Sequence, residues 1–422
     1  MVEESILSDE FIRQLISVGE VDILIGIPTH NDGKTVGSAI QAIQAGLVKS
    51  FPRERAAIIN TDGGSTDGTP DIVQAASISD VHRGFNGYTL RTLHSISTQY
   101  ARTPSEALAL RTILSASELL RARACVVISA ESSSVDASWI ERLLRPAYRE
   151  NFDLVAPIYR RNKFEGVLVT NLIYPMTRAL YGRRLREPYS PDFACSGRLA
   201  SQFLLQHNWD TGSERDDPRM DLTISALSDG CRIHQAFLGT REQAKPQSRD
   251  LVNAIRQTVG SLFSSLESKF PIWSKTVGSE PVPTTGPEFD ISPDPLRINR
   301  KQLRQMFSQG VGELSSILRS ILQEPTLAEL LRLAETEESA FRFGPELWVR
   351  TVYEFAASYN KSVINRDHLL QVLVPIYRGR MFTFLTENRN ASSEEVAGNI
   401  ENLCLEFERL KPYLIELWNG RK

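Results

Sequence analysis

Acidic and small polar residues follow three apolar segments of the chain, and their types could bind a ligand. The three stretches read IPTHND at Ile27–Asp32, NTDGGSTDGT at Asn60–Thr69 and ISAESSS at Ile128–Ser134. Carboxylates accept hydrogen bonds from a base or a ribose, and glycine and serine let a flat ligand approach the backbone. Aspartates of this kind also form turns and cap helices, which is the alternative role for Asp62 and Asp67.

The segments around these stretches predict alternating strands and helices. Continuous apolar runs are typical of strands covered on both faces. We expect strands at 22–27, 56–60, 125–129 and 154–158, and helices at 36–46 (ending at Gly46), 69–76, 104–122 and 137–149. This alternation indicates an α/β fold with a mostly parallel sheet. In such sheets ligands bind beyond the carboxyl ends of the strands, so the three stretches should share one edge.

The amino-acid composition of the sequence changes from residue 278 onwards. GSEPVPTTGPEFDISPDP, at 278–295, is rich in proline, serine and acidic residues and predicts an extended connection. Helical patterns follow at 314–322, 327–335, 346–359 and 393–418. We therefore predict a first domain at 1–280, a linker at 281–298 and a helical C-terminal region at 299–422.

Composition narrows the class of protein. The 422 residues carry a formal net charge of -3, with a pI near 6.2, and no basic stripe indicates nucleic-acid binding. No apolar run approaches the length of a membrane span, so we expect no membrane partner. The cysteines, which are scattered without metal-ligand spacing, favour reduced, buried thiols and a cytoplasmic location: Cys125, Cys195, Cys231 and Cys404.

Two motifs together, PTHNDGKTVG and DGGSTDGT, resemble the start of GT-A fold glycosyltransferases. The resemblance implies a Rossmann-like domain that binds a nucleoside-diphosphate sugar at its first two strand ends. It places Asp62 near a uracil or guanine base. The other residues that it implies around the donor nucleotide are Pro28, Thr29, Asn31, Gly63, Arg102 and Ala130.

The resemblance extends to the retaining enzymes that make glucosylglycerate, glucosyl-3-phosphoglycerate or mannosylglycerate. It covers 159–180, CSGRLA at 195–200, 217–227 and 343–359. It implies transfer of glucose or mannose, from UDP-glucose or GDP-mannose, to glycerate or a similar small hydroxy acid. The sequence chooses neither the sugar nor the base, and a homo-oligomer is compatible with it.

The metal motif of that family is altered in this chain. The family's third strand ends in Asp-x-Asp, whereas this chain has Ser129, Ala130 and Glu131. A later histidine of the family is replaced near Glu242. The resemblance therefore implies a divalent cation, Mg or Mn, held by Glu131 and Glu242. An alternative is that Arg102 and Arg241 neutralise the diphosphate without a metal.

The acceptor side is altered as well. Thr170 matches a threonine that touches the acceptor in the phosphoglycerate enzymes, but the arginine expected two residues earlier is Leu168. Since arginine is the natural partner of phosphate, this change favours an unphosphorylated acceptor. The resemblance adds Asp221 as a catalytic carboxylate near the sugar or acceptor. We also expect Arg160 or Arg161 to meet the acceptor carboxylate, and Ser196 and Gly197 to form a backbone donor turn.

Two functions stay open at this point. The first is the transferase, in which Glu131 and Asp221 carry the catalysis. The second is a catalytically impaired protein that binds a nucleotide sugar as a sensor or scaffold, an alternative that the altered metal positions suggest.

Overall fold

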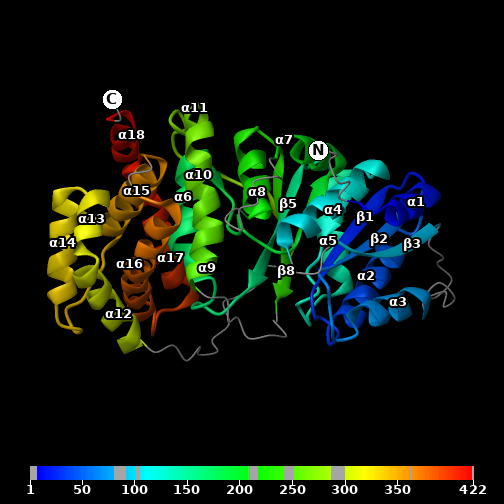
Figure 1. Cartoon of the computed structure of the whole chain (residues 1–422), viewed down its shortest axis with the longest axis horizontal. Coiled ribbons are helices and arrows are strands. Elements are labelled where there is room, and N and C mark those ends of the chain that lie inside the picture. The colour runs from blue at the N-terminus through cyan, green and yellow to red at the C-terminus, as the bar shows by residue number, and fades with distance from the viewer. Residues whose placement is uncertain are drawn as a thin grey trace.

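The protein is described here from a computed structural model. The structure describes residues 7–79, 92–100, 105–207, 209, 217–241, 251–286, 300–361 and 364–420. A sheet flanked by helices forms one end of the molecule, and a group of helices forms the other (Figure 1). None of the described helices combines the length and the apolarity needed to cross a membrane.

The sheet has eight strands in the order β10-β8-β5-β7-β4-β1-β2-β3. All neighbouring pairs are parallel except those of β7, which runs against both β4 and β5. The strands are β1 Ile23–Thr29, β2 Arg55–Asp62, β3 Thr92–Gln99, β4 Ala124–Val127, β5 Leu154–Arg160, β7 Phe193–Ser196, β8 Ile233–Thr240 and β10 Thr284–Thr285; β6 Arg183–Arg184 and β9 Glu280–Pro281 pair separately. The predicted α/β class with a mostly parallel sheet is confirmed.

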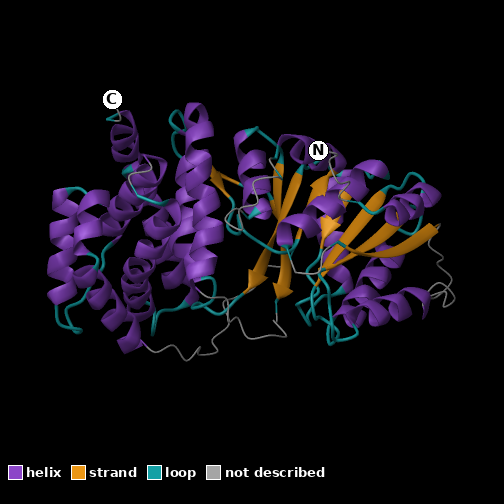
Figure 2. Ribbon diagram, viewed as in Figure 1, coloured by secondary structure: helices purple, strands orange, loops and turns teal. Residues whose placement is uncertain are grey.

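Helices cover both faces of the sheet (Figure 2). One face packs on α2 Val36–Ser50, α3 Thr69–Ser79 and α5 Ala137–Arg149. The other packs on α1 Asp9–Val18, α4 Glu106–Leu119, α7 Gly197–Gln206 and α8 Pro218–Ser228. The central strands β1 and β4 are buried on both sides, which explains their nearly continuous apolar sequences.

The core of the second face continues without interruption into the C-terminal helices. These are α12 Arg300–Glu313, α13 Ser315–Ile321, α14 Glu324–Glu335, α15 Pro345–Lys361, α16 Arg366–Glu387, α17 Ser393–Arg409 and α18 Lys411–Asn419. Between the sheet and this region lie η1 Val169–Ile173, a short π-helix, then α6 Tyr174–Tyr181, α9 Leu251–Ala254, a second π-helix η2 Ile255–Val259, α10 Gly260–Ser268 and α11 Phe270–Trp273. The predicted helical C-terminal region is confirmed, whereas the boundaries at 280 and 298 stay predictions.

Two local predictions were wrong, and one strand was not predicted. The second helix passes through Gly46 to Ser50, because Gly46 is a contact glycine: a Cβ there would lie 2.6 Å from the Ala137 carbonyl oxygen on α5. The edge strand β3 was missed, since its sequence TLHSISTQ is largely polar. The helical run at 393–418 breaks at Leu410, where α18 begins with Lys411 and Pro412.

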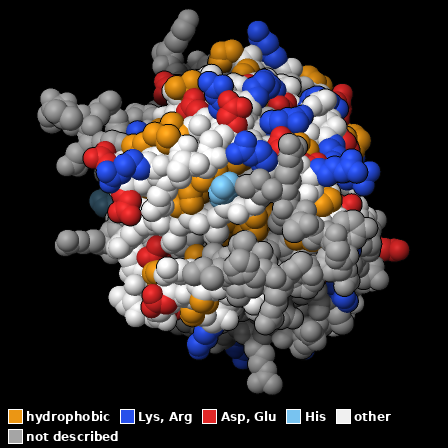
Figure 3. Space-filling model, turned by 90° about the vertical axis from the view of Figure 1, so that its right-hand side faces the viewer, with side chains coloured by type: hydrophobic (Ala, Val, Ile, Leu, Met, Phe, Trp, Pro, Cys, Tyr) orange, Lys and Arg blue, Asp and Glu red, His pale blue; other side chains and the backbone are white. Residues whose placement is uncertain are grey.

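The state of the thiols agrees with the sequence, and one face of the molecule shows how the charged side chains are distributed. Seen from the side of α1, β3 and α3, basic and acidic side chains are interspersed, with more of the basic ones on the upper half (Figure 3). All four cysteines are buried and free, as predicted.

Candidate functional site

The loops after β1 and β2 meet at the carboxyl edge of the sheet. Thr29 and Asp62 end these neighbouring strands in register, and the Gly63 amide donates a hydrogen bond to the Thr29 carbonyl at 2.9 Å. Pro28 lies one step earlier, opposite Thr61. The parallel register therefore brings four of the residues implied by the resemblance onto one edge of the sheet: Pro28, Thr29, Asp62 and Gly63.

Asp62 is buried, and both oxygens of its carboxylate accept hydrogen bonds from residues of the two loops. One oxygen accepts from the Thr29 and Ser65 hydroxyls at 3.1 and 2.6 Å, and the other accepts from the Gly64 and Ser65 amides at 3.0 and 2.9 Å. A carboxylate has about four acceptor positions, so these bonds occupy its capacity. Asp62 shapes the loop here, and a direct contact to a base stays a prediction.

Asn31 joins the two loops in a left-handed backbone conformation, with φ 56°. Its amide donates to the Ser65 hydroxyl at 2.9 Å, and its side-chain oxygen accepts from the Thr66 amide at 2.9 Å. Asp67 accepts from the Gly33 amide at 3.0 Å, and a hydrogen bond from the Thr69 hydroxyl is the main cause that lowers the pKa of Asp67. The glycine- and serine-rich sequence thus folds into two loops that hold one another.

The third stretch is tied to the first through Ala130. Its carbonyl oxygen accepts from the Thr35 hydroxyl at 2.5 Å. Glu131 follows and is half-buried, and its amide donates to the Ser129 hydroxyl at 3.4 Å. The structure therefore brings all three stretches to one edge, as their sequences predicted.

A buried carboxylate that the sequence analysis missed lies behind this third stretch. Asp192, fully buried, accepts from the Ser129 amide at 2.7 Å with one oxygen. The other oxygen accepts from the Tyr159 hydroxyl at 2.5 Å and from Arg241 Nε at 3.0 Å. Burial and the negative charge of Asp192 raise the pKa of Tyr159, which keeps its proton. Asp192 immediately precedes β7, and its place in the chain gives no signal for this contact.

Arg241 places a positive charge behind the end of β4. Its side chain is 6% exposed, and burial opposes its charge, but Asp192 and Tyr159 outweigh burial and raise the pKa of Arg241. Its Nη2 is buried without a hydrogen-bond partner among the described residues. Glu131 is close enough to favour the same charge. This edge of the sheet therefore holds a fixed guanidinium with a donor still to be used.

Thr170 and Arg161 lie near each other on the segment after β5. Thr170 stands on η1, and its hydroxyl is 3.4 Å from the Gly166 carbonyl oxygen. A Cβ on Gly166 would lie 2.6 Å from Arg161 Nη1, so the guanidinium packs on the same turn. Arg161 also pairs with Glu187 at 3.1 Å; burial raises the pKa of Glu187 although Arg161 opposes the shift. Arg160, at the exposed end of β5, is the neighbour of this group in sequence.

Asp221 lies in the first turn of α8 and faces another element. Its carboxylate is 3.7 Å from His207 Nδ1, just beyond the end of α7. Burial lowers the pKa of His207, so the imidazole is neutral at pH 7 and the contact is not a full ion pair. The catalytic role of Asp221 stays a prediction.

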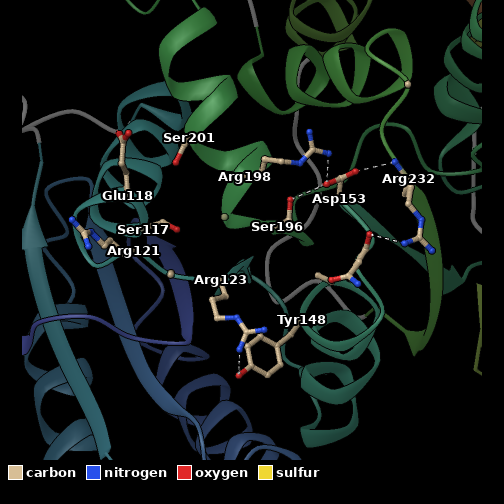
Figure 4. A pocket seen from close by; sticks show the side chains of 15 residues that line it. Ser117, Glu118, Arg121, Arg123, Tyr148, Asp153, Ser196, Arg198, Ser201 and Arg232 are labelled. Atoms are coloured by element: carbon tan, nitrogen blue, oxygen red, sulfur yellow. Dashed lines mark hydrogen bonds and ion pairs between the residues drawn. The ribbon is translucent and has the colours of Figure 1, made fainter.

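The structure places Ser196 and Gly197 at the opposite, amino edge of the sheet. Ser196 pairs with Ala124, the first residue of β4, and the antiparallel direction of β7 carries the turn away from the nucleotide loops. Both residues line a cavity of about 840 Å³ between the ends of α4, α5 and α8 (Figure 4). Four arginines also line it: Arg121, Arg123, Arg198 and Arg232.

The arginines of this cavity already have partners. Arg198 contacts Asp153 at 2.7 Å, Arg121 contacts Glu20 at 2.9 Å, and Arg123 donates to the Tyr148 hydroxyl at 3.1 Å. The Ser196 hydroxyl donates to Asp153 and accepts from the Leu199 amide, capping α7. The turn is thus explained by capping, and it is not brought together with Thr170. Arg102 and Glu242, the remaining predicted site residues, lie outside the described residues.

Comparisons with known proteins complete this description. No protein-family model and no curated protein matches the chain. Solved structures of glucosyl-3-phosphoglycerate synthase from Mycobacterium tuberculosis are similar to it. The complex with Mn²⁺, UDP and phosphoglyceric acid is 20% identical, with a TM-score of 0.40, over 61% of this chain and 82% of that one.

Two further structures give the same picture. The Mg²⁺ and UDP complex of the same synthase is 21% identical, with a TM-score of 0.41, over 63% of this chain and 86% of that one. A structure described as a mycobacterial protein is 20% identical, with a TM-score of 0.43, over 61% and 79%. Because the sequence identities are near 20% and the TM-scores are below 0.5, the functional conclusion rests on the residues of the site.

Proposed function

We propose that the chain is a retaining glycosyltransferase of the GT-A type. It moves glucose or mannose from a nucleoside-diphosphate sugar to glycerate or a similar small hydroxy acid. The observation that carries this proposal is the carboxyl edge of the sheet. There, the loops around Asp62 and Asn31 are bonded to each other, and Arg241 is connected through Asp192 to Ser129 at the end of the neighbouring strand β4.

The loops supply a shaped surface for the nucleoside. Glycine and small polar residues let the base and ribose approach the backbone of 28–31 and 62–65. The loop is held from within by Asp62, so it is ordered before a ligand binds and less conformational entropy is lost on binding. This arrangement supports a nucleotide site at this edge.

Arg241 supplies the charge that the chemistry needs. As the bond between sugar and diphosphate breaks, negative charge builds on the leaving phosphate oxygens, and a preorganised donor stabilises it. Arg241 Nη2 is such a donor, because its guanidinium is fixed by Asp192 and this nitrogen has no hydrogen-bond partner among the described residues. The acceptor then lies on the side of Thr170 and Arg161, which offer a hydroxyl and a cation.

A divalent cation is implied by the resemblance, and it binds in the neighbours. The residues described here do not make up its ligand set. Glu131 offers a carboxylate, but Asp192 already accepts three hydrogen bonds, and Arg241 brings a positive charge to the same place. Like charges within a few ångströms repel, so a protein-held cation and this guanidinium compete for the site. We therefore assign the charge opposite the diphosphate to Arg241.

The alternative is a protein that binds a nucleotide sugar without turning it over. The observation in its favour is the replacement of the family's first metal carboxylate by Ser129, whose amide is bonded to the buried Asp192. In that case the edge keeps its binding loops and lacks the chemistry of transfer.

Turnover distinguishes the two functions. The protein is incubated with UDP-glucose or GDP-mannose and D-glycerate, with Mg²⁺, with Mn²⁺ and with excess chelator, and released nucleoside diphosphate is measured. Glycerate-dependent release supports the transferase. Tight binding of the donor without release, in all three conditions and with a panel of small hydroxy acids, supports the sensor or scaffold.

A further inference from the structure

The C-terminal helices grip the turn that carries Thr170. On α15, Trp348 Nε1 donates to the Asn171 carbonyl oxygen at 2.8 Å. On α16, Arg380 Nε donates to the Asn171 side-chain oxygen at 3.1 Å, and its Nη1 donates to the Phe343 carbonyl at 2.9 Å. Asn171, Trp348 and Arg380 are all buried. Two helices from the far end of the chain therefore fix one residue of η1.

The guanidinium also decides which way the Asn171 amide faces. Arginine has donors only, so the atom of Asn171 opposite Arg380 must be Oδ1. Nδ2 then faces the Thr170 hydroxyl oxygen, at 3.3 Å. An amide nitrogen can only donate, and Thr170 Oγ1 must accept. The hydroxyl proton of Thr170 is thereby turned away from Asn171.

That proton has no strong partner within the turn. The two carbonyl oxygens near it, of Gly166 and Val167, are both 3.4 Å from Thr170 Oγ1, at the long limit of a hydrogen bond. Thr170 is partly exposed, so an oxygen of a bound molecule can take the proton at a shorter distance. The turn thus presents a donor hydroxyl of defined direction.

Arg380 is costly to keep in this place. It is 3% exposed, and within the described ranges no carboxylate lies within ion-pair distance of it, although Glu387 is close enough to favour its charge. Burial lowers the pKa of Arg380 to about 10. A buried charge without an ion-pair partner carries a cost of desolvation that an apolar side chain would not have. The hydrogen bonds to Asn171 and Phe343 offset part of this cost.

We propose that Arg380 and Asn171 are positioning residues that orient the Thr170 hydroxyl as a hydrogen-bond donor to the acceptor substrate. The receiving atom is a carboxylate or hydroxyl oxygen of the small hydroxy acid. The C-terminal helical region thereby acts on the acceptor site through the orientation of Thr170. This inference rests on the proposed function.

Asn171→Asp tests the relay because it separates stability from orientation. One oxygen of the new carboxylate still accepts from Arg380, now as an ion pair, so the thermal midpoint should hold or rise. The other oxygen accepts where Nδ2 donated, and it takes the Thr170 proton. The acceptor KM should therefore rise about five- to tenfold, the worth of one hydrogen bond. UDP affinity, measured by calorimetry, should not change.

Thr170→Val supplies the matched control. It should raise the acceptor KM by a similar factor, and the double variant with Asn171→Asp should cost no more than Thr170→Val alone. Additive effects, or an unchanged acceptor KM in Asn171→Asp with normal wild-type turnover, overturn the inference and leave the proposed function intact. Absence of turnover in the wild-type protein with every acceptor overturns the proposed function and the inference with it.

Discussion

Arg241 Nε lies 3.0 Å from the Asp192 carboxylate, and the same carboxylate holds the Ser129 amide at the end of β4. The backbone that follows β4 is therefore attached to a guanidinium through one buried residue. The positive charge of Arg241 and the negative charge of Asp192 thus form a buried pair directly behind Ser129.

The first prediction concerns this charge. UDP should bind equally well in excess chelator and in Mg²⁺, since Arg241 supplies the positive charge. Arg241→Gln should weaken UDP binding about tenfold or more, because a charge-assisted hydrogen bond contributes about 1.5–3 kcal/mol. Calorimetry measures both effects. Arg145→Gln, which removes an exposed arginine on α5, is the control. If chelation alone abolished UDP binding, a metal ion and not Arg241 would neutralise the diphosphate.

The second prediction concerns the loop around Asp62. Asp62→Asn keeps the shape but gives the side chain a donor, which then opposes either the Gly64 and Ser65 amides or the hydroxyls of Thr29 and Ser65. The loop loses part of its order, and we expect UDP affinity to fall about tenfold. Asp71→Asn, on the exposed side of α3, serves as the control and should leave the affinity unchanged. Equal affinities of the two variants would contradict this role of Asp62.

The third prediction compares two glycines with left-handed backbones. Gly166 and Gly230 have φ 65° and 69°, so an alanine at either costs about 1 kcal/mol of stability. A Cβ on Gly166 meets Arg161 Nη1, whereas a Cβ on Gly230 has nothing within 4 Å. Gly166→Ala should therefore raise the acceptor KM, and Gly230→Ala should not, at similar thermal midpoints. A parallel rise in both variants would show that backbone strain alone is responsible.

The fourth prediction concerns the amino edge. Ser196→Ala removes the N-cap of α7 and should cost about 1 kcal/mol in urea unfolding. Since Ser196 lies on the opposite edge from Thr170, the acceptor KM should not change. Arg198→Ala, in the same cavity, should likewise leave the acceptor KM unchanged. An acceptor KM that rises in either variant would restore the acceptor role that the sequence predicted for this turn.

The fifth prediction concerns pH. Lys411, buried on α18, donates to the Ala179 and Thr276 carbonyl oxygens at 2.9 and 2.6 Å, and burial lowers the pKa of Lys411 to about 8. In the unfolded chain, the pKa of Lys411 is ~10.4. Between these values the unfolded state binds more protons, so the contribution of Lys411 to the free energy of unfolding increases as pH rises.

Lys411→Met removes this contribution. The difference in free energy of unfolding, wild type minus variant, should shift in favour of the wild type by about 2–3 kcal/mol between pH 8 and ~10.4. Urea unfolding at several pH values measures it, and the subtraction cancels the groups that titrate in both proteins. A difference that stays constant over this range would show that Lys411 keeps its ordinary pKa when folded.

The sequence predicted the strands that are buried on both faces, because burial demands continuous apolar residues such as ILIGI in β1. It could not predict β3, whose edge position permits polar residues. Gly46 was misread because a glycine that allows two helices to approach has the same sequence signature as one that ends a helix.

The candidate site was predictable where its residues follow strands in order. Thr29, Asn31, Asp62 and Ala130 all come from such loops. Asp192 and the relay through Asn171 depend on tertiary contacts across 63 and 209 positions of sequence, which no local pattern encodes. Ser196 was assigned to the acceptor side from the resemblance of CSGRLA to the family's turn, and the direction of β7, which four residues do not reveal, places it at the amino edge.

The reversed direction of β7 also limits how the chain can vary in length. Asp192 reaches the carboxyl edge because it stands immediately before this strand, at the end where the parallel strands finish. One residue inserted between Asp192 and Phe193 would displace the carboxylate by about 3.4 Å along the strand, or force a bulge, while β7 kept its pairing. The direct succession of these two residues therefore fixes the position of the Asp192 carboxylate, and with it that of Arg241, at the site. We expect loops elsewhere on the sheet to accept insertions that this junction does not.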